Sequence, residues 1–541
     1  MQDDRSMPQE TGFFKNLSAY AHQIKCRSPL YDMALGRAAS VDDAPLVIPP
    51  DPWSGDAGRG YDIVQGLYLF DGQSFRSIDV LWEPEGFHDG WLSSMHGFDM
   101  LRDLRAFGGE RARQHARYLI SDWLDHYSRW HALSWRPDIT ARRIVHWLSA
   151  YSAFCASAGE EFRHAMLESL SRQIKHLSKH AGEGDLLYTA KALFYGGMAM
   201  GQEKYCRQAL HILAADIQND ILSDGGHKSR APEQHLVFLQ NLLDIRAAIH
   251  LAGLSVPDFL THTAGKMAAV LRSLRHNDGG LGLFHGGGAA GGSLCDMVLA
   301  QAGASGGRPL KSLGVTGYDR MSQGRTTIIM DTGKPSDRQN YAGLLAFEMS
   351  AGRDRLIVNC GAWAGHPAWQ QALASTAAHS TVTVEESNAL PAKGAEIPLK
   401  KIAVTKIRED LNGTGLIDAT HDGYLERFGV THRRVMTLKN NGNLLHGQDI
   451  LSGMDGASFA VRFHLHPSVR ASVIGDGTRV LLRTGTGQGW EFTCNGGVFG
   501  LEESVYSPGR HADTPRKTLQ IAVYAQIFGQ KTIVDWNLSR I

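Results

Sequence analysis

The 541-residue sequence lacks several features that would place it quickly in a class of protein. Its six cysteines show no CxxC spacing, which argues against a disulfide framework or a cysteine-based zinc site and favours buried free thiols in a reducing compartment. Lys plus Arg and Asp plus Glu both number 55, so the basic excess typical of nucleic-acid binders is missing. No run of about 18 apolar residues predicts a membrane-spanning helix. We therefore expect neither a nucleic-acid partner nor a membrane span.

The N-terminal segment MQDDRSMPQETGFF has no basic region followed by an apolar one, as an ordinary signal peptide would. We expect a cytoplasmic location, or a periplasmic one reached by another export route. The oligomeric state is open, with a homodimer as one option. Hydrophobic residues make up 43% of the chain, enough for large cores in two to four domains.

The spacing of apolar residues divides the chain into three regions. Residues 1–95 are irregular, with a short candidate hairpin at 66–75. Residues 96–310 show the 3.6-residue period of amphipathic helices, which recur as an array of helical hairpins, a solenoid or a closed toroid. Residues 311–541 alternate with a period of two over a dozen or more segments, which predicts stacked antiparallel sheets. The expected fold is therefore all-α first and then a β-sandwich.

One Gly-led loop carries the most reactive-looking side chains. The stretch DGGHKSRAPEQH (224–235) places His227, Arg230 and His235 between two predicted helices, where a rigid scaffold commonly displays functional groups. The structural alternative is that His235 begins the next helix and Arg230 pairs with a nearby acid.

Two further segments offer groups that could contact a sugar. SWRPDITARRIVHWL (134–148) contains Trp135 for stacking and Arg142 and Arg143 for carboxylates, although a core tryptophan and a surface arginine would explain the same pattern. In the predicted strand FAVRFHLHPSV, Arg462 and His464 share a face opposite the apolar side chains. That face either lines a groove or is simply solvated.

Several other chemistries have no motif here. The sequence contains no GxxxxGK[ST] phosphate loop, no HExxH and no GxSxG elbow, and its Gly-rich runs do not follow a strand in a βαβ unit. Its 25 histidines show no convincing metal spacing, so we expect no metal and no cofactor.

From about residue 97 to the end, the sequence resembles the heparinase II/III-like family of polysaccharide lyases. The resemblance is carried, in order, by WRPDITARRIVHWL, LYTAKALFYGGMAM, DGGHKSRAPEQHLVFLQNLLDIR, LAFEMSAGRDRLIVNCGA, STAAHSTVTVEESN and RFHLHPSV. It implies an incomplete α/α toroid followed by a β-sandwich. It also implies β-elimination on uronic-acid polysaccharides, with one group to neutralise the carboxylate, a base for the C5 proton and an acid for the leaving oxygen.

The sequence departs from the family pattern at several positions. Gly184 and Asp185 stand where relatives often have an Asn-His pair, and Gln234 stands where they have a tyrosine. The usual His-x-His-x-Asp of the sandwich and the Asp of the next strand become Gln339, Tyr341, Gly343 and Asn359. Only His379 remains of the group that binds zinc in some relatives, which again predicts no metal.

We therefore expect a lyase acting on an acidic, uronate-containing polysaccharide. In this hypothesis His227 or His235 is the base, Arg230 binds the carboxylate, and Tyr341 is the acid beside His379. The alternative is a catalytically silent glycan-binding or exopolysaccharide-assembly protein of the same fold.

Overall fold

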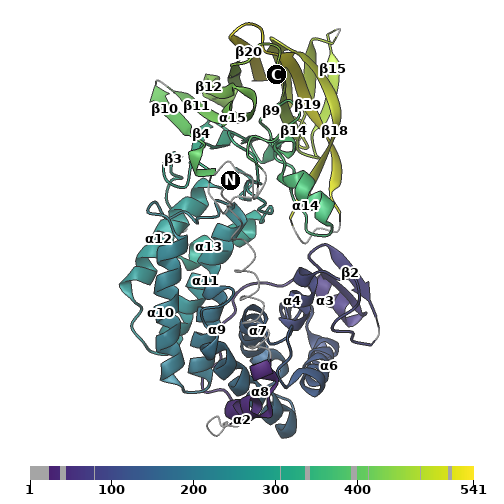
Figure 1. Cartoon of the computed structure of the whole chain (residues 1–541), viewed down its shortest axis with the longest axis vertical. Coiled ribbons are helices and arrows are strands. Elements are labelled where there is room, and N and C mark those ends of the chain that lie inside the picture. The colour runs from purple at the N-terminus through teal and green to yellow at the C-terminus, as the bar shows by residue number, and fades with distance from the viewer. Residues whose placement is uncertain are drawn as a thin grey trace, which may run out of the picture. The chain divides into compact units, whose positions relative to one another are not determined.

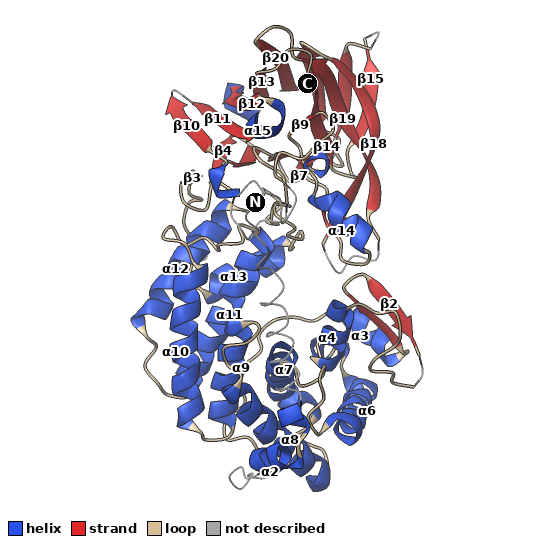
Figure 2. Cartoon of the chain, in the orientation of Figure 1, coloured by secondary structure: helices blue, strands red, loops and turns tan. Residues whose placement is uncertain are grey.

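The structure, a computed structural model, separates helices from strands along the chain (Figures 1 and 2). It describes residues 24–36, 44–77, 79–304, 306–335, 341–391, 399–411, 413–475, 477–509 and 514–541. In these ranges long helices come first and antiparallel sheets follow, as the change of apolar period predicted.

The helical part begins with short elements and continues with longer helices. The predicted hairpin is confirmed: β1 (Leu67–Phe70) pairs with β2 (Gln73–Arg76) in antiparallel register. The helices are α2 (Pro29–Gly36), α3 (Ala57–Val64), α4 (Asp89–His96), α5 (Leu101–Phe107), α6 (Gly109–Tyr127), α7 (Pro137–Phe154), α8 (Glu160–Lys179), α9 (Leu186–Ala199), α10 (Glu203–Asp220), α11 (Pro232–Leu251), α12 (Asp258–Ser273) and α13 (Gly292–Gln301).

Helix α7 illustrates why these segments are helical. Pro137 lies in the first turn, where its missing N–H costs nothing. The predicted face of Ile144, Trp147, Leu148, Tyr151 and Phe154 is buried along its whole length. None of the described helices is long and apolar enough to cross a membrane.

Two sheets form the second part of the chain. The ten-stranded sheet has the order β3 (Ser312–Leu313), β4 (Tyr318–Gln323), β5 (Thr326–Asp331), β6 (Phe347–Ala351), β7 (Asp354–Val358), β14 (Ser458–Leu465), β19 (Arg516–Gln526), β18 (Val498–Pro508) and β8 (Gly361–Ala362), with β9 (Val382–Val384) also paired to β14. The eight-stranded sheet has the order β10 (Val404–Leu411), β11 (Thr414–Tyr424), β12 (Val430–Lys439), β13 (Leu444–Ser452), β20 (Lys531–Arg540), β17 (Gly489–Asn495), β16 (Arg479–Arg483) and β15 (Arg470–Ile474). Two short helices, α14 (Pro367–Ala374) and α15 (Leu425–Phe428), interrupt the strands.

One apolar core joins the two sheets into a sandwich. Phe347 of the ten-stranded sheet stacks on Trp536 of the eight-stranded sheet with 5.7 Å between ring centroids, and Phe463 contacts both rings. The predicted alternation of β14 is confirmed, since Val461, Phe463 and Leu465 all belong to this core.

The chain forms two compact units, judged by the contacts within each. The first contains 1–216 and 244–256, and the second contains 217–243 and 257–541. The loops at 221–230 and 276–291 are bonded to the first strands of the sandwich, for example by the Leu283 N–H, which donates to Glu348 over 2.9 Å. These bonds place the last helices in the same unit as the sheets.

Candidate functional site

The loop that carries His227 and Arg230 is fixed by backbone bonds and by one carboxylate. Ile221 and His227 form an isolated antiparallel bridge. Asp224 accepts hydrogen bonds from the Thr316 N–H and the Thr316 hydroxyl, both at 2.7 Å. The loop is therefore held against the segment that leads into β4.

Arg230 is an interior residue of this loop. It has a positive φ of 61°, and its guanidinium forms an ion pair with Asp331 at the end of β5. It also donates to the Thr316 carbonyl over 2.8 Å and to the Gly317 carbonyl over 3.2 Å. These partners occupy the guanidinium, so the structural alternative is confirmed and Arg230 is not available as a carboxylate clamp.

His285 also lies beside Asp331, and the sequence reasoning missed it. Its Nε2 is 2.8 Å from Asp331 Oδ2, and its side chain is 4% exposed. Both ring nitrogens are buried and neither forms a hydrogen bond, because the contact with Asp331 lacks hydrogen-bond geometry. It has a positive φ of 52°, unusual for a residue other than glycine. The available signal was a single histidine at the start of the Gly run FHGGGAAGG, a run treated only as a domain break.

The electrostatics of this group favour a charged aspartate and a neutral imidazole. Burial works against ionisation of Asp331, yet Arg230 and His285 lower the pKa of its carboxyl to about 2. Burial lowers the pKa of His285 below its ordinary value, although Asp331 opposes this shift. The nearby Asp331 carboxylate favours the tautomer of His285 that carries its proton on Nε2, and in that tautomer Nδ1 is a proton acceptor.

Tyr341 and His379 lie next to this pair. The Tyr341 ring packs on Gly286, where an added Cβ would lie 2.3 Å from Cε2 of the ring. Its ring meets that of His379 edge to face at 6.2 Å. His379 is buried, its Nδ1 bonds the Ser375 carbonyl at 2.8 Å, and burial lowers its pKa to about 4. The structure thus brings five side chains together. We call them the Asp331 cluster, which consists of Arg230, His285, Asp331, Tyr341 and His379.

His227 and His235 have structural partners of their own. The Nδ1 of His227 lies 2.7 Å from the Ser229 hydroxyl, and its ring packs against Phe238. His235 is 2% exposed in the first turn of α11, and its Nε2 bonds the Met267 carbonyl at 2.8 Å. Burial lowers the pKa of His235 to about 4. Nδ1 of His235 is also buried without a hydrogen-bond partner, and His227 lies 3.9 Å from Asp220. His285 differs from both by its 2.8 Å contact with a buried carboxylate.

The predicted sugar-binding residues of the helical part are mostly interior. Trp135 is 1% exposed and donates to the Tyr127 carbonyl over 2.8 Å, so it is a core residue. Arg143 is fully buried, bonds Gln173, and lies 4.0 Å from the centre of the Trp123 ring. Arg142 differs: its side chain is 34% exposed and bonds Asp99 at 2.7 Å.

On β14 the two predicted residues have different surroundings. His464 is buried: its Nε2 bonds the Ala377 carbonyl at 2.9 Å, and its Nδ1 lies 2.7 Å from the Ser504 hydroxyl. It does not line a groove, because the segment before β9 covers it. Arg462 is 15% exposed, and its role as a binding residue stays a prediction.

The residues at the family's zinc positions give no ligand set in the structure. Both ends of the Asn359 amide are used, one by Glu348 at 3.2 Å and one by the Ser380 N–H at 2.9 Å. Gln339 lies outside the described residues. Among the residues that the structure describes, no group of three His, Cys, Asp or Glu side chains could hold a metal ion.

Both parts of the chain match models of the same protein family. A model described as "Heparinase II/III N-terminus" matches residues 100–276, and one described as "Heparinase II/III-like, C-terminal" matches residues 305–537. A relative from Caulobacter vibrioides, named FtsZ-localized protein C, is 31% identical over 527 residues, covering 91% of this chain and 89% of its own.

Solved structures of lyases have the same fold. The crystal structure of heparinase III matches with a TM-score of 0.71 at 16% identity, over 86% of this chain and 79% of its own. A mutant of the heparan sulfate lyase HepC from Pedobacter heparinus matches with a TM-score of 0.63 at 15% identity, over 97% and 87%. The predicted α/α toroid followed by a β-sandwich is therefore confirmed as the fold.

Proposed function

Because the chain belongs to the heparinase II/III-like family, we propose that it is a polysaccharide lyase that cleaves an acidic, uronate-containing polysaccharide by β-elimination. In this reaction a base removes the C5 proton of the uronate. The electron pair of the C5–H bond forms the C4–C5 double bond as the C4–O bond breaks, and an acid protonates the departing oxygen.

The observation that supports this proposal is the Arg230–Asp331–His285 arrangement. Arg230 keeps Asp331 ionised, and the Asp331 carboxylate, 2.8 Å from Nε2 of His285, favours a proton on that nitrogen and stabilises the imidazolium that forms. His285 Nδ1 is then the atom that takes the C5 proton. Its lowered pKa keeps the imidazole unprotonated and ready to accept at neutral pH.

Tyr341 is the proposed acid. Its ring packs on Gly286, the residue that follows His285, so its hydroxyl belongs to the same cluster as the base. His379 supports the tyrosine ring edge to face. His285 takes the role of base that the original hypothesis gave to His227 or His235, and Arg230 acts on Asp331 instead of on the uronate carboxylate.

The test is ultraviolet absorbance of the unsaturated uronate product. The whole chain is incubated with heparan sulfate, chondroitin sulfate, hyaluronan, alginate, glucuronan and bacterial exopolysaccharides. We expect a rising signal with one of these polymers and none after Tyr341→Phe. A flat trace for a folded protein that binds one of the polymers would support the silent glycan-binding alternative and overturn the lyase proposal.

A second candidate function comes from the Caulobacter relative, whose name places it with FtsZ and whose similarity spans nearly both chains. In this view the chain localises with FtsZ, as the name of the relative says of that protein. Purified chain should then pellet with polymerised FtsZ and stay in solution without it; absence of co-pelleting would remove this candidate.

A further inference from the structure

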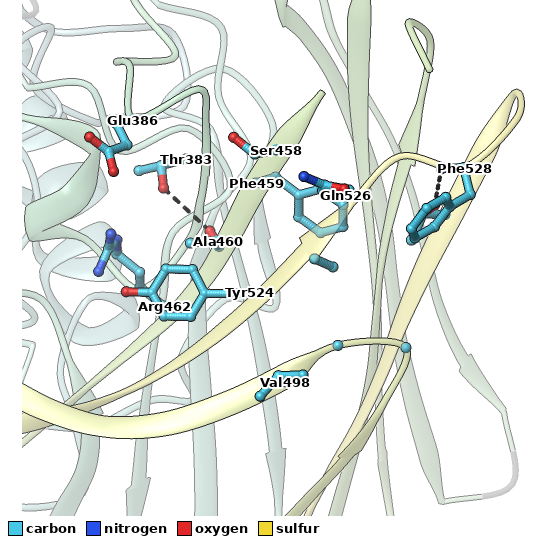
Figure 3. Close-up of a pocket in the computed structure, with 14 residues that line it drawn as sticks. Thr383, Glu386, Ser458, Phe459, Ala460, Arg462, Val498, Tyr524, Gln526 and Phe528 are labelled. Atoms are coloured by element: carbon cyan, nitrogen blue, oxygen red, sulfur yellow. Dashed lines mark hydrogen bonds between the residues drawn. The ribbon is translucent and has the colours of Figure 1, made fainter. Parts of the chain in front are cut away.

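A cavity of about 810 Å³ lies against the ten-stranded sheet and shares no residue with the Asp331 cluster. Its wall is made by β9, β14 and β19, together with the turns before β18 and after β19 (Figure 3). The volume lies within the roughly 300–1,000 Å³ of small-ligand sites. The cavity belongs entirely to the second unit.

An aromatic ring with a fixed orientation forms one wall. Tyr524 is 45% exposed on the outer face of β19, while its neighbour Val523 is in the sandwich core. The Tyr524 hydroxyl donates to Glu502 over 2.6 Å, which holds the ring in place. An exposed, oriented ring offers its negative π face to the C–H groups of a sugar, which carry partial positive charge.

Two polar side chains of opposite charge face the same space (Figure 3). Glu386 is exposed in a tight turn closed by the Val384–Ser387 bridge, and both Glu385 and Glu386 have a positive φ, of 48° and 52°. The Glu385 carboxylate attaches the turn to β14, because it accepts a hydrogen bond from the Ser458 N–H over 2.6 Å. Strain in two successive residues other than glycine is uncommon and tends to persist at functional positions.

Arg462 supplies the positive group. Its Nη1 has a long bond of 3.4 Å to Gln520 and lies 3.7 Å from Glu502, while its Nε is buried with no hydrogen-bond partner. A guanidinium has five N–H donors, so these contacts leave Arg462 able to donate to a ligand. The two charges balance within the lining, so the cavity does not select an anionic ligand by charge.

We propose that this cavity binds a neutral pyranose ring of a glycan, stacked on Tyr524, with its hydroxyl groups bonded by Glu386 and Arg462. Vicinal hydroxyls both donate and accept, which matches a carboxylate beside a guanidinium. A uronate would meet Glu386 at close range. A purely apolar side chain would leave both charged groups without partners. This glycan-binding site is separate from the Asp331 cluster, and the proposal does not require that cluster to be catalytic.

Titration calorimetry on the whole chain tests the proposal. The probes are neutral tetrasaccharides (cellotetraose, maltotetraose, laminaritetraose and chitotetraose), with tetragalacturonate and a capped apolar tetrapeptide for comparison. We expect one neutral tetrasaccharide to bind. Tyr524→Ala should weaken it by about tenfold or more, in the range of a principal contact residue, and Tyr524→Phe should restore it because the ring remains.

Tyr118→Ala is the matched control, since Tyr118 has the same exposure of 45% on helix α6 of the other unit. It should bind like the parent chain. Glu386→Gln should also weaken binding, through loss of the strong carboxylate acceptor. Thermal unfolding of each variant confirms that it is folded.

The proposal is overturned if no neutral tetrasaccharide binds, if only the uronate or the peptide binds, or if Tyr524→Ala binds as tightly as Tyr118→Ala. Absence of lyase activity in the parent chain would leave these binding results unaffected, so the two proposals fail separately.

Discussion

At the residue scale, the carboxylate of Asp331 organises the candidate site. It is buried, paired with Arg230 and in contact with His285, and both of these partners have a positive φ. Two strained residues directed at one carboxylate indicate that the surrounding structure holds them there at a cost. Removing either partner should therefore have distinct consequences for stability and for chemistry.

The first prediction concerns the buried ion pair. Arg230→Leu should destabilise the second unit by about 3–5 kcal/mol, because it leaves the Asp331 charge buried without compensation. Urea unfolding measures this loss. The double variant Arg230→Leu with Asp331→Asn should regain part of it.

The control is Arg433→Leu, which breaks an ion pair with Asp418 whose arginine is 48% exposed. That change should cost at most about 1 kcal/mol, as exposed pairs do. Equal losses for the Arg230 and Arg433 variants would show that the Arg230 pair is not an important interior contact.

The second prediction separates chemistry from folding at His285. His285→Gln should lower the lyase rate by about 10²–10⁴, the usual contribution of a general base, while the unfolding midpoint changes little. His262→Gln, at an exposed position on α12, should keep the parent rate. If the His285 variant keeps the parent rate, His285 is not the base and another residue removes the C5 proton.

At the scale of elements, the turn that follows β9 has a strained backbone, and this backbone positions the Glu386 side chain at the cavity. Both of its central residues are glutamates in a left-handed conformation, where glycine or asparagine is usual.

The third prediction follows from this turn. Glu386→Gly should stabilise the chain by roughly 0.5–1 kcal/mol, because glycine adopts the positive φ without steric cost. The same change should weaken binding at the cavity. Urea unfolding and calorimetry measure the two effects, and a destabilised Glu386→Gly variant would show that the Glu386 backbone is not strained.

At the scale of the whole molecule, buried histidines dominate the response to acid. Burial is the first cause that lowers the pKa of His146, His235 and His379 to about 4 and that of His464 to about 3. An unfolded histidine titrates near 6.5, so below that pH the unfolded chain binds more protons than the folded one.

The fourth prediction is therefore a loss of stability as the pH falls from about 6.5 towards 4, with each such histidine contributing up to about 1.4 kcal/mol per pH unit. Asp331, whose folded pKa is about 2, adds a further loss below about pH 4. Urea unfolding at pH 7.5, 6, 5 and 4.5 tests this. Constant stability over that range would contradict the neutral, buried state of these histidines.

The fifth prediction concerns the thiols. Cys26, Cys155, Cys206, Cys295 and Cys360 are buried, and Cys494 is partly buried. Burial raises the pKa of Cys155 and Cys360 to about 12. A thiol reagent at pH 8 should react slowly with the folded chain. After denaturation without reductant, it should react with all six thiols. Fewer than six reacting thiols would indicate a disulfide.

Apolar periodicity by itself determined the order of helices and strands, the hairpin at 66–75 and the inner face of β14, because these depend on local spacing of side chains along one segment. The resemblance to the family did not come from periodicity: six ordered sequence segments carried it, and the family models match residues 100–276 and 305–537. Periodicity could not distinguish a functional Trp135 from a core one, because both readings need the same residue at the same helical position.

Only the tertiary structure decided which groups meet. Arg230, His285, Asp331 and Tyr341 come from four separate segments, and no local pattern records that a loop after α12 returns to the end of β5. Burial, likewise, is a property of packing rather than of sequence: it gave Arg143 and His464 structural partners and left both ring nitrogens of His285 without a hydrogen bond. The sequence set the fold, and long-range contacts set the chemistry that the fold offers.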